Sequence, residues 1–135
     1  MILIVCVDNH MGMLFNHRRQ SQDRVLRQRI LDRTADSRLW MDAYSAKQFA
    51  DAAAPQIQVA EDFLQKALPG EFCFVEDQAV RPFERQIEKI ILYKWNRTYP
   101  ADLYFDVPLA SWKLKNATDF QGSSHDAITE EVYCR

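Results

Sequence analysis

The chain opens with Met1-Ile2-Leu3-Ile4-Val5-Cys6-Val7-Asp8, seven apolar residues followed by an aspartate. A continuous apolar run of this length is typical of a strand that is buried on both faces, so we predict such a strand over Ile2–Val7. The run is too short for the apolar region of a signal peptide and far too short to span a bilayer. The sequence therefore predicts a domain built around a buried N-terminal strand.

Further strands and helices alternate along the chain after this strand. We predict strands at Leu39–Met41, Ile57–Ala60, Phe72–Val75 and Lys89–Trp95, and helices at Arg24–Arg33, Ser45–Asp51, Asp62–Leu68 and Asp77–Gln86. Residues Asn9–Gln22 are predicted to form a polar loop. Two alternating segments, Trp112–Phe120 and Ala127–Cys134, flank a turn at Gly122–Asp126 and predict an antiparallel hairpin. The pattern predicts one α/β domain over residues 1–135, with a mixed, mostly parallel sheet, flanking helices and a C-terminal antiparallel hairpin.

Composition excludes some partners and favours a compartment. The 17 basic and 19 acidic side chains give a net charge of −2, so no global field draws the protein to nucleic acid or to a membrane. A nucleic acid or a membrane would therefore have to bind a local patch of basic residues. Cys6, Cys73 and Cys134 are odd in number and far apart, which indicates reduced thiols and a cytoplasmic protein.

The order of these elements resembles dihydrofolate reductase, and the resemblance spans nearly the whole chain. It is carried by Leu3–Asp8 followed by Met11-Gly12, by Asp102–Phe105, by Trp112–Leu114 and by Gly122–Thr129. The resemblance implies the dihydrofolate reductase fold, NADPH as the cofactor and a folate as the substrate.

This sequence differs from that family at the positions where the family binds its cofactor. Only three glycines occur in 135 residues. Glu76-Asp77 stand in place of the family's glycine pair, and Asp42–Ser45 in place of its Gly-Arg-x-Thr turn, which leaves only the hydroxyl of Ser45. Glycines let the amides of a helix N-terminus approach a pyrophosphate, and a carboxylate about 5 Å from a phosphate costs about 3 kcal/mol at an effective dielectric of about 20. We therefore expect no NADPH in the usual pose, and no other cofactor.

The substrate side of the family's cleft is altered as well. The resemblance implies a Pro-Trp pair where this chain has His17–Gln20, and a threonine where it has Tyr93. The segment that would carry an arginine for the folate glutamate is missing between Phe49 and Ile57. Asp23 matches the family carboxylate that assists protonation of the substrate ring. The alternative role of Asp23 is to cap the helix that follows, and we favour the cap.

Arginines are concentrated in the first loop and helix. Six lie within sixteen residues, at positions Arg18, Arg19, Arg24, Arg27, Arg29 and Arg33. Guanidinium groups bind phosphates and carboxylates, so an anionic ligand or a nucleic-acid backbone is one interpretation. The other interpretation is a solvated helix face, which we favour because no aromatic residues interleave the arginines.

The remaining candidate binding or catalytic residues are the segment Trp95–Pro100 and the three histidines. Trp95–Pro100 places two aromatic residues around an arginine. This arrangement could stack on a planar ring of a ligand, or it could serve as a structural hinge.

A two-zinc hydrolase of the ribonuclease Z kind needs clustered metal ligands. The chain has only His10, His17 and His125, so we predict no metal. A metal-free nuclease that uses a loop histidine stays an alternative, but we expect all three to be surface groups.

These observations predict a dihydrofolate reductase-like protein that is not an active reductase and acts as a binding or interaction protein. The residues predicted to contact a small or anionic ligand are Arg18, Arg19, Ser45, Tyr93 and Trp95. One alternative is a divergent enzyme with Asp23 as its acid, and another is an arginine-mediated binder of nucleic acid. A homodimer that covers an exposed sheet edge is also predicted, and no membrane partner. A cleft that is open and lined by Asp23 would favour the enzyme, whereas a cleft filled by Tyr93 and Trp95 would favour a structural role.

Overall fold

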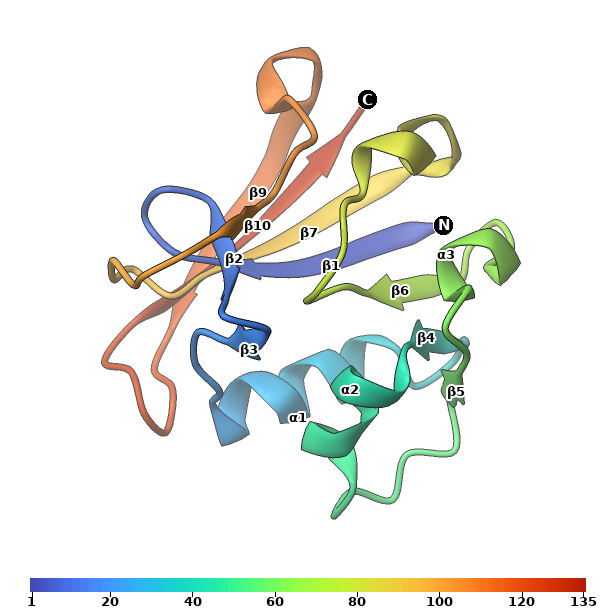
Figure 1. Ribbon diagram of the computed structural model, residues 1–135, viewed down its shortest axis with the longest axis horizontal. Coiled ribbons are helices and arrows are strands. Elements are labelled where there is room, and N and C mark those ends of the chain that lie inside the picture. Colours follow the sequence, from blue (N-terminus) through green and yellow to red (C-terminus); the bar gives the residue numbers. More distant parts are fainter.

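A seven-stranded sheet crosses the molecule in the order β5-β4-β6-β1-β7-β10-β9 (Figure 1). The computed structural model describes all residues, 1–135. Its strands are β1 (Ile2–Val7), β2 (Gly12–Phe15), β3 (Arg18–Arg19), β4 (Leu39–Met41), β5 (Ile57–Val59), β6 (Phe72–Phe74), β7 (Lys89–Lys94), β8 (Leu103–Tyr104), β9 (Lys113–Phe120) and β10 (Ile128–Cys134). Its helices are α1 (Arg24–Arg33), α2 (Ala43–Ala46) and α3 (Phe63–Lys66), with short 3₁₀ helices η1 (Lys47–Phe49), η2 (Arg81–Gln86) and η3 (Leu109–Ser111).

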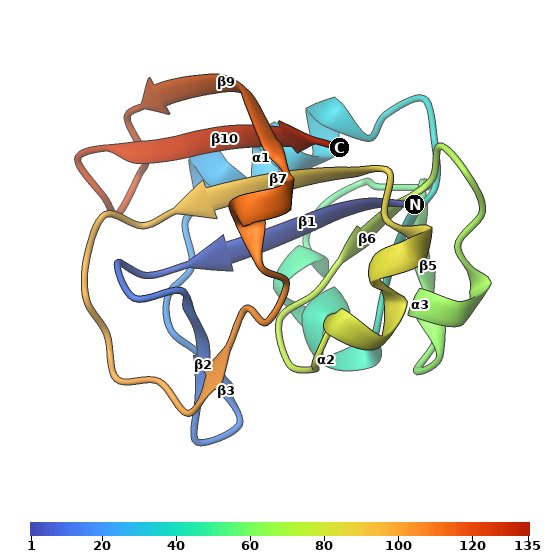
Figure 2. The same ribbon diagram turned by 90° about the horizontal axis from the view of Figure 1, so that it is seen from above.

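The sheet is mixed, and β1 lies in its parallel part. β1 pairs in parallel with β6 on one side and with β7 on the other, and β4 pairs in parallel with β5 and β6. β10 runs antiparallel to β7 and to β9, so the C-terminal hairpin extends the sheet beyond β7 (Figure 2). A separate three-stranded sheet, β3-β2-β8, lies beside it. The predicted fold class is confirmed.

Side chains of the central strands alternate between two apolar cores. Leu3 and Val5 pack on one face with residues of α3, while Ile4 packs on the other face with Leu26 and Ile30 of α1. Alternation of this kind follows from the period of two in a strand. Because both faces are covered, four of the six β1 residues are buried and the other two, Ile2 and Cys6, are partly buried, as the opening apolar run predicts.

α1 is tied to the sheet by a buried glutamate as well as by its apolar face. Glu130 of β10 is 2% exposed. Its carboxylate accepts from Arg29 Nε at 2.9 Å, from Arg33 Nη2 at 2.9 Å and from Tyr93 Oη at 2.7 Å. Burial alone would raise the pKa of Glu130, but the hydrogen bonds from Arg33, Arg29 and Tyr93 outweigh it and lower the pKa to about 2. Two of the six clustered arginines therefore serve the interior of the fold.

Most predicted elements are confirmed, with ends that differ by one or two residues. The strands, α1, α3 and the C-terminal hairpin occupy the predicted segments. The helix predicted at Ser45–Asp51 begins earlier, at Ala43, because Asp42 caps it by accepting from Ser45 N. No helix of the structure has both the length and the apolar character that crossing a membrane demands.

Two predicted segments are wrong. Asn9–Gln22 is not simply a polar loop: β2 and β3 form a hairpin in it, and β2 also pairs with β8. The predicted helix over Asp77–Gln86 is reduced to η2, which begins only at Arg81. Pro82 has no amide hydrogen and is tolerated only at such a start, and the amides of Val80 and Arg81 are bonded to Asp106 rather than to a preceding turn.

We expect Glu130→Gln to destabilise the fold by about 3 kcal/mol at pH 7, the equivalent of the lowered pKa of Glu130. Because that pKa is lower in the folded state, the stabilisation is present above pH about 4.5 and is lost as pH falls toward 2. Urea unfolding of both proteins across this range measures the difference. Asp36→Asn, at an exposed site, is the control, and a difference for Glu130→Gln that persisted unchanged at pH 2 would contradict the prediction.

Candidate functional site

The cleft between α1 and the sheet is filled by side chains. The remaining cavity has a volume of about 10 Å³, which is room for about one water molecule. It is lined by Cys6, Ser21, Asp23, Leu26, Arg27, Ile30, Gln48, Phe74, Glu76 and Trp95. Trp95 is buried at the cleft and Tyr93 is wholly buried behind it, with its hydroxyl donated to Glu130. No ligand enters this cleft unless these side chains move.

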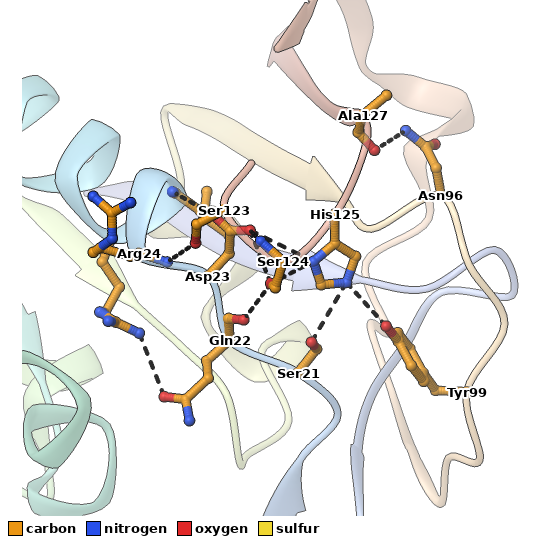
Figure 3. Close-up of polar contacts among 12 residues, drawn as sticks. Ser21, Gln22, Asp23, Arg24, Asn96, Tyr99, Ser123, Ser124, His125 and Ala127 are labelled. Carbon is orange, nitrogen blue, oxygen red and sulfur yellow. Dashed lines mark hydrogen bonds and ion pairs between the residues drawn. The ribbon is translucent and has the colours of Figure 1, made fainter. Parts of the chain in front are cut away.

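Asp23 is fixed by contacts to both ends of the chain. Its Oδ1 accepts from Leu26 N at 3.0 Å, and its Oδ2 accepts from Ser124 N at 2.7 Å and from Ser124 Oγ at 2.9 Å (Figure 3). Burial raises the pKa of Asp23, but these hydrogen bonds outweigh it and hold the pKa far below its usual value. The predicted helix cap is confirmed. A carboxylate with these contacts carries no proton at neutral pH, which weighs against Asp23 as a catalytic acid.

His125 links Asp23 to the loop after β7. Its Nδ1 lies 2.9 Å from Ser124 Oγ, and its Nε2 lies 2.9 Å from Tyr99 Oη (Figure 3). The ring is 4% exposed and stacks on Trp95 with 4.6 Å between centroids. Burial, followed by the charge of Arg97, lowers the pKa of His125, so the ring is neutral at pH 7. The expectation of a surface histidine at this position is wrong.

The contacts of Ser124 decide which ring nitrogen carries the proton. Ser124 has one hydroxyl hydrogen, and the ionised carboxylate of Asp23 is its strongest acceptor. His125 Nδ1 must then donate to Ser124 Oγ, and Nε2 must accept from Tyr99. In a hydrolytic triad the serine hydroxyl donates to an unprotonated nitrogen of the histidine, and the aspartate accepts from the other ring nitrogen. This Ser-His-Asp set is therefore a structural chain of hydrogen bonds, not an activated nucleophile.

At the carboxyl ends of β4 and β6, acidic side chains occupy the region of the expected cofactor site. Glu76 is 8% exposed and pairs with Arg19, with Nε to Oε2 at 3.0 Å and Nη2 to Oε1 at 3.2 Å. Arg19 also donates to Tyr44 O and lies over the Tyr44 ring, 4.5 Å from its centroid. The hairpin of β2 and β3 is thereby fastened to the sheet and to α2, and Arg19 is not free for a ligand.

Asp77 faces a second carboxylate. Its Oδ1 is buried and has no hydrogen-bond partner. Burial, and then a hydrogen bond to Asp42 together with the charge of that carboxylate, raise the pKa of Asp77 to about 7. Asp77 therefore holds its proton at a pH where an ordinary aspartate is ionised.

Backbone amides that a phosphate would require are already bonded to carboxylates. Ala43 N at the start of α2 donates to Glu61 Oε2 at 3.0 Å. Val80 N and Arg81 N both donate to Asp106 Oδ1 at 3.0 Å. Anions bind helix N-termini through such free amides. The side chains of this chain satisfy them internally, and they also surround the region with negative charge.

The structure disperses the residues that the sequence predicts at a ligand. Arg18 and Arg19 line a shallow pocket with Tyr99 and Pro100. Ser45 is buried in α2, and its Oγ has no partner. Together with the buried Tyr93 and Trp95, these residues do not surround one common space.

A charged groove lies elsewhere, between α1 and the segment that contains η1. It has a volume of about 330 Å³. It is lined by Arg24, Arg27, Gln28, Leu31, Gln48, Phe49, Asp51 and Ala52. Arg24 and Arg27 make no ion pair, unlike Arg19, Arg29 and Arg33. The sequence places both arginines on the helix, but only the fold brings the apolar floor beside them.

A solved structure shares this architecture over almost its whole length. Dihydrofolate reductase from Enterococcus faecalis, complexed with NADP(H) and RAB-propyl, matches this chain with a TM-score of 0.70. The match covers 99% of this chain and 95% of that one, at 12% sequence identity. This chain has the dihydrofolate reductase fold. No protein-family model matches the sequence, and no curated protein matches it. At this identity the likeness of the two dihydrofolate reductase folds concerns architecture alone.

We expect Asp77→Asn to stabilise the protein at pH 8 by about 1 to 2 kcal/mol, because it removes the charge that faces Asp42. The pKa of Asp77 is raised in the folded state, so its protonated form supports the fold at acid pH and that support is lost as pH rises through about 7. Thermal unfolding at pH 5 and pH 8 should show the gain mainly at pH 8. Asp36→Asn is again the control, and an equal gain at both values of pH would contradict the assignment.

We expect the neutral ring of His125 to carry its proton on Nδ1. Nitrogen-15 NMR of the ring nitrogens at pH 7 measures this directly. Ser124→Ala should destabilise the protein by about 1 to 2 kcal/mol because Nδ1 loses its acceptor and Asp23 loses one of its donors, the Ser124 hydroxyl. A proton on Nε2 would mean that Ser124 donates to the ring, and the hydrolytic interpretation would return.

Proposed function

We propose that this chain is a ligand-binding protein, not a reductase, and that it holds a small amphipathic anion in the groove between α1 and η1. The observation that carries the proposal is a pair of arginines without ion pairs, Arg24 and Arg27, beside a floor of buried apolar side chains. Figure 1 shows α1 beside the α2 segment that leads into η1.

The groove has arginines for the acidic group of an amphipathic ligand and apolar side chains for its hydrocarbon part. Arg24 and Arg27 lie one turn apart on α1, so both guanidinium groups can bind one carboxylate or phosphate with charge-assisted hydrogen bonds. Leu31 and Phe49 provide the apolar floor. A volume of about 330 Å³ lies at the small end of ligand sites. These features favour a short aliphatic or aromatic acid over a large cofactor.

Three observations support a role other than reduction of folate. The cleft retains about 10 Å³ of free space. The amides at the start of α2 and before η2 are bonded to Glu61 and Asp106. The carboxylate of Asp42, and that of Asp77 where it is ionised, add repulsion toward a pyrophosphate. Each of the three opposes NADPH independently of the others.

A thermal-shift titration tests the binding of a small acid and the binding of NADPH separately. Ligands that bind only the native state raise the melting temperature by mass action. We expect hexanoate to raise it, and expect no rise with about 1 mM NADPH, alone or with dihydrofolate. A rise with NADPH would overturn the non-reductase assignment, and no rise with any acid would overturn the anion-binding assignment.

We expect Arg27→Gln to weaken hexanoate binding by about tenfold, or about 1.4 kcal/mol, through loss of one charge-assisted contact. Arg24→Gln should act similarly. Isothermal titration calorimetry measures the dissociation constants, with Arg81→Gln as the control because Arg81 lies outside the groove. Equal affinity in all four proteins would place the acid elsewhere.

The same variants test the alternative of nucleic-acid binding. A duplex that bound through Arg24 and Arg27 would lose affinity steeply as salt rises, with a slope set by the number of phosphates contacted. Hexanoate carries one charge, so its affinity should fall only weakly. Tight, strongly salt-dependent binding of a short duplex, with no binding of hexanoate, would favour nucleic acid as the partner.

A further inference from the structure

A second pocket lies where the β2–β3 hairpin faces the loop after β7. It has a volume of about 300 Å³. It is lined by Phe15, Asn16, Arg18, Arg19, Gln20, Tyr99 and Pro100. It shares no residue with the groove of Arg24 and Arg27, so it stands apart from the function proposed above.

The loop side of this pocket is held in place by hydrogen bonds. Tyr99 Oη lies 2.9 Å from His125 Nε2, and Tyr99 N donates to Asp8 Oδ2 at 3.2 Å. Gln20 Nε2 bridges the two sides, because it donates to Asp8 Oδ2 at 3.0 Å and to Pro100 O at 3.3 Å. The ring of Tyr99 and the ring of Pro100 are therefore fixed surfaces, which lowers the entropy that binding must overcome.

The hairpin side is equally well defined. Phe15 and Arg18 are cross-strand partners that flank a two-residue turn. Both turn residues have positive φ, 50° at Asn16 and 61° at His17, which is the geometry of a type I′ hairpin turn. Asn16 N also donates to Asp102 Oδ2 at 3.1 Å. Directly paired residues project from the same face, so the Phe15 ring and the Arg18 guanidinium lie together.

The charge of this pocket is not balanced. No carboxylate lines it. Arg19 is paired with Glu76, but Arg18 makes no ion pair. Phe15 is 47% exposed, so one face of its ring is open to solvent. A free cation next to an exposed aromatic face has no structural partner within the chain.

We propose that this pocket binds a planar aromatic acid. The ring of the ligand stacks on Phe15 and packs against Tyr99 and Pro100, and its anionic group binds the guanidinium of Arg18. Aromatic pairs of this kind contribute about 0.5–1.5 kcal/mol beyond burial, and the guanidinium fork matches a carboxylate or a phosphate. The shared chemistry is a flat ring with one acidic group, supplied either by an aromatic carboxylate or by a nucleoside monophosphate.

An NMR titration of the full chain tests the proposal with three probes. These are indole-3-carboxylate, adenosine 5′-monophosphate and neutral indole. We expect the amide signals of residues 15–20 and of Tyr99 to shift with the acidic probes, and expect indole-3-carboxylate to bind at least tenfold more tightly than indole. The acid that binds more tightly identifies the source of the ligand. Equal affinity for indole-3-carboxylate and indole, or shifts confined to Arg24, Arg27 and Phe49, would overturn the proposal.

Variants separate the ring contact from the charge contact. Arg18→Gln should abolish the preference for indole-3-carboxylate over indole, whereas Phe15→Ala should weaken both about equally. Both positions are at the surface, so the fold should be kept, which circular dichroism verifies. Arg27→Gln is the matched control, since it impairs only the other groove. Indole-3-carboxylate affinity that is unchanged in both Arg18→Gln and Phe15→Ala would overturn the proposal, even if hexanoate binding to the α1 groove is confirmed.

Discussion

The carboxylate of Asp23 is the constraint on which the arrangement of this molecule depends. Its two oxygens bind the first turn of α1 and the turn between β9 and β10, segments that are a hundred residues apart in sequence. Ser123 Oγ, in the same turn, accepts from the amide of Arg24. The C-terminal hairpin therefore determines where α1 begins. Because α1 supplies one wall of the cleft and one wall of the outer groove, this contact sets the width of both.

Internal carboxylates bind several of the donors of this chain. Glu61 and Asp106 bind exposed amides, and Glu76 binds Arg19, so donors that suit a phosphate are already satisfied. Such pairs remove the penalty of unsatisfied polar groups, but they also lower any affinity for an anion at the same place. The occupied amides therefore result from acidic side chains, whereas the closed cleft results from Trp95 and the apolar side chains around it.

The sequence predicts those parts of the fold that local patterns control. β1 follows from an apolar run, α1 from helical spacing after Asp23, and the last hairpin from alternation around a turn. β2 was missed because it is short: it makes two residue pairs with β3, and its other partner, β8, is about ninety residues away. The pairing of Arg19 with Glu76 joins positions 57 residues apart, and no local signal marks it. The burial of His125 was not predicted, because it depends on stacking against Trp95, which lies thirty residues earlier in the sequence.

The distribution of unpaired charge explains why the two proposed ligand sites lie at the margins of this fold. Arg19, Arg29 and Arg33 are paired with buried glutamates, so they stabilise the interior and are unavailable to partners. Of the remaining arginines, Arg18 lies on the hairpin and Arg24 and Arg27 line the groove outside the cleft, although Arg27 also contributes to the cleft wall. An arginine at such a position stays hydrated at little cost, and it can exchange water for an anion without disturbing a buried pair. A protein that fills its central cleft can therefore still bind small acids, provided that apolar surface lies next to these free cations.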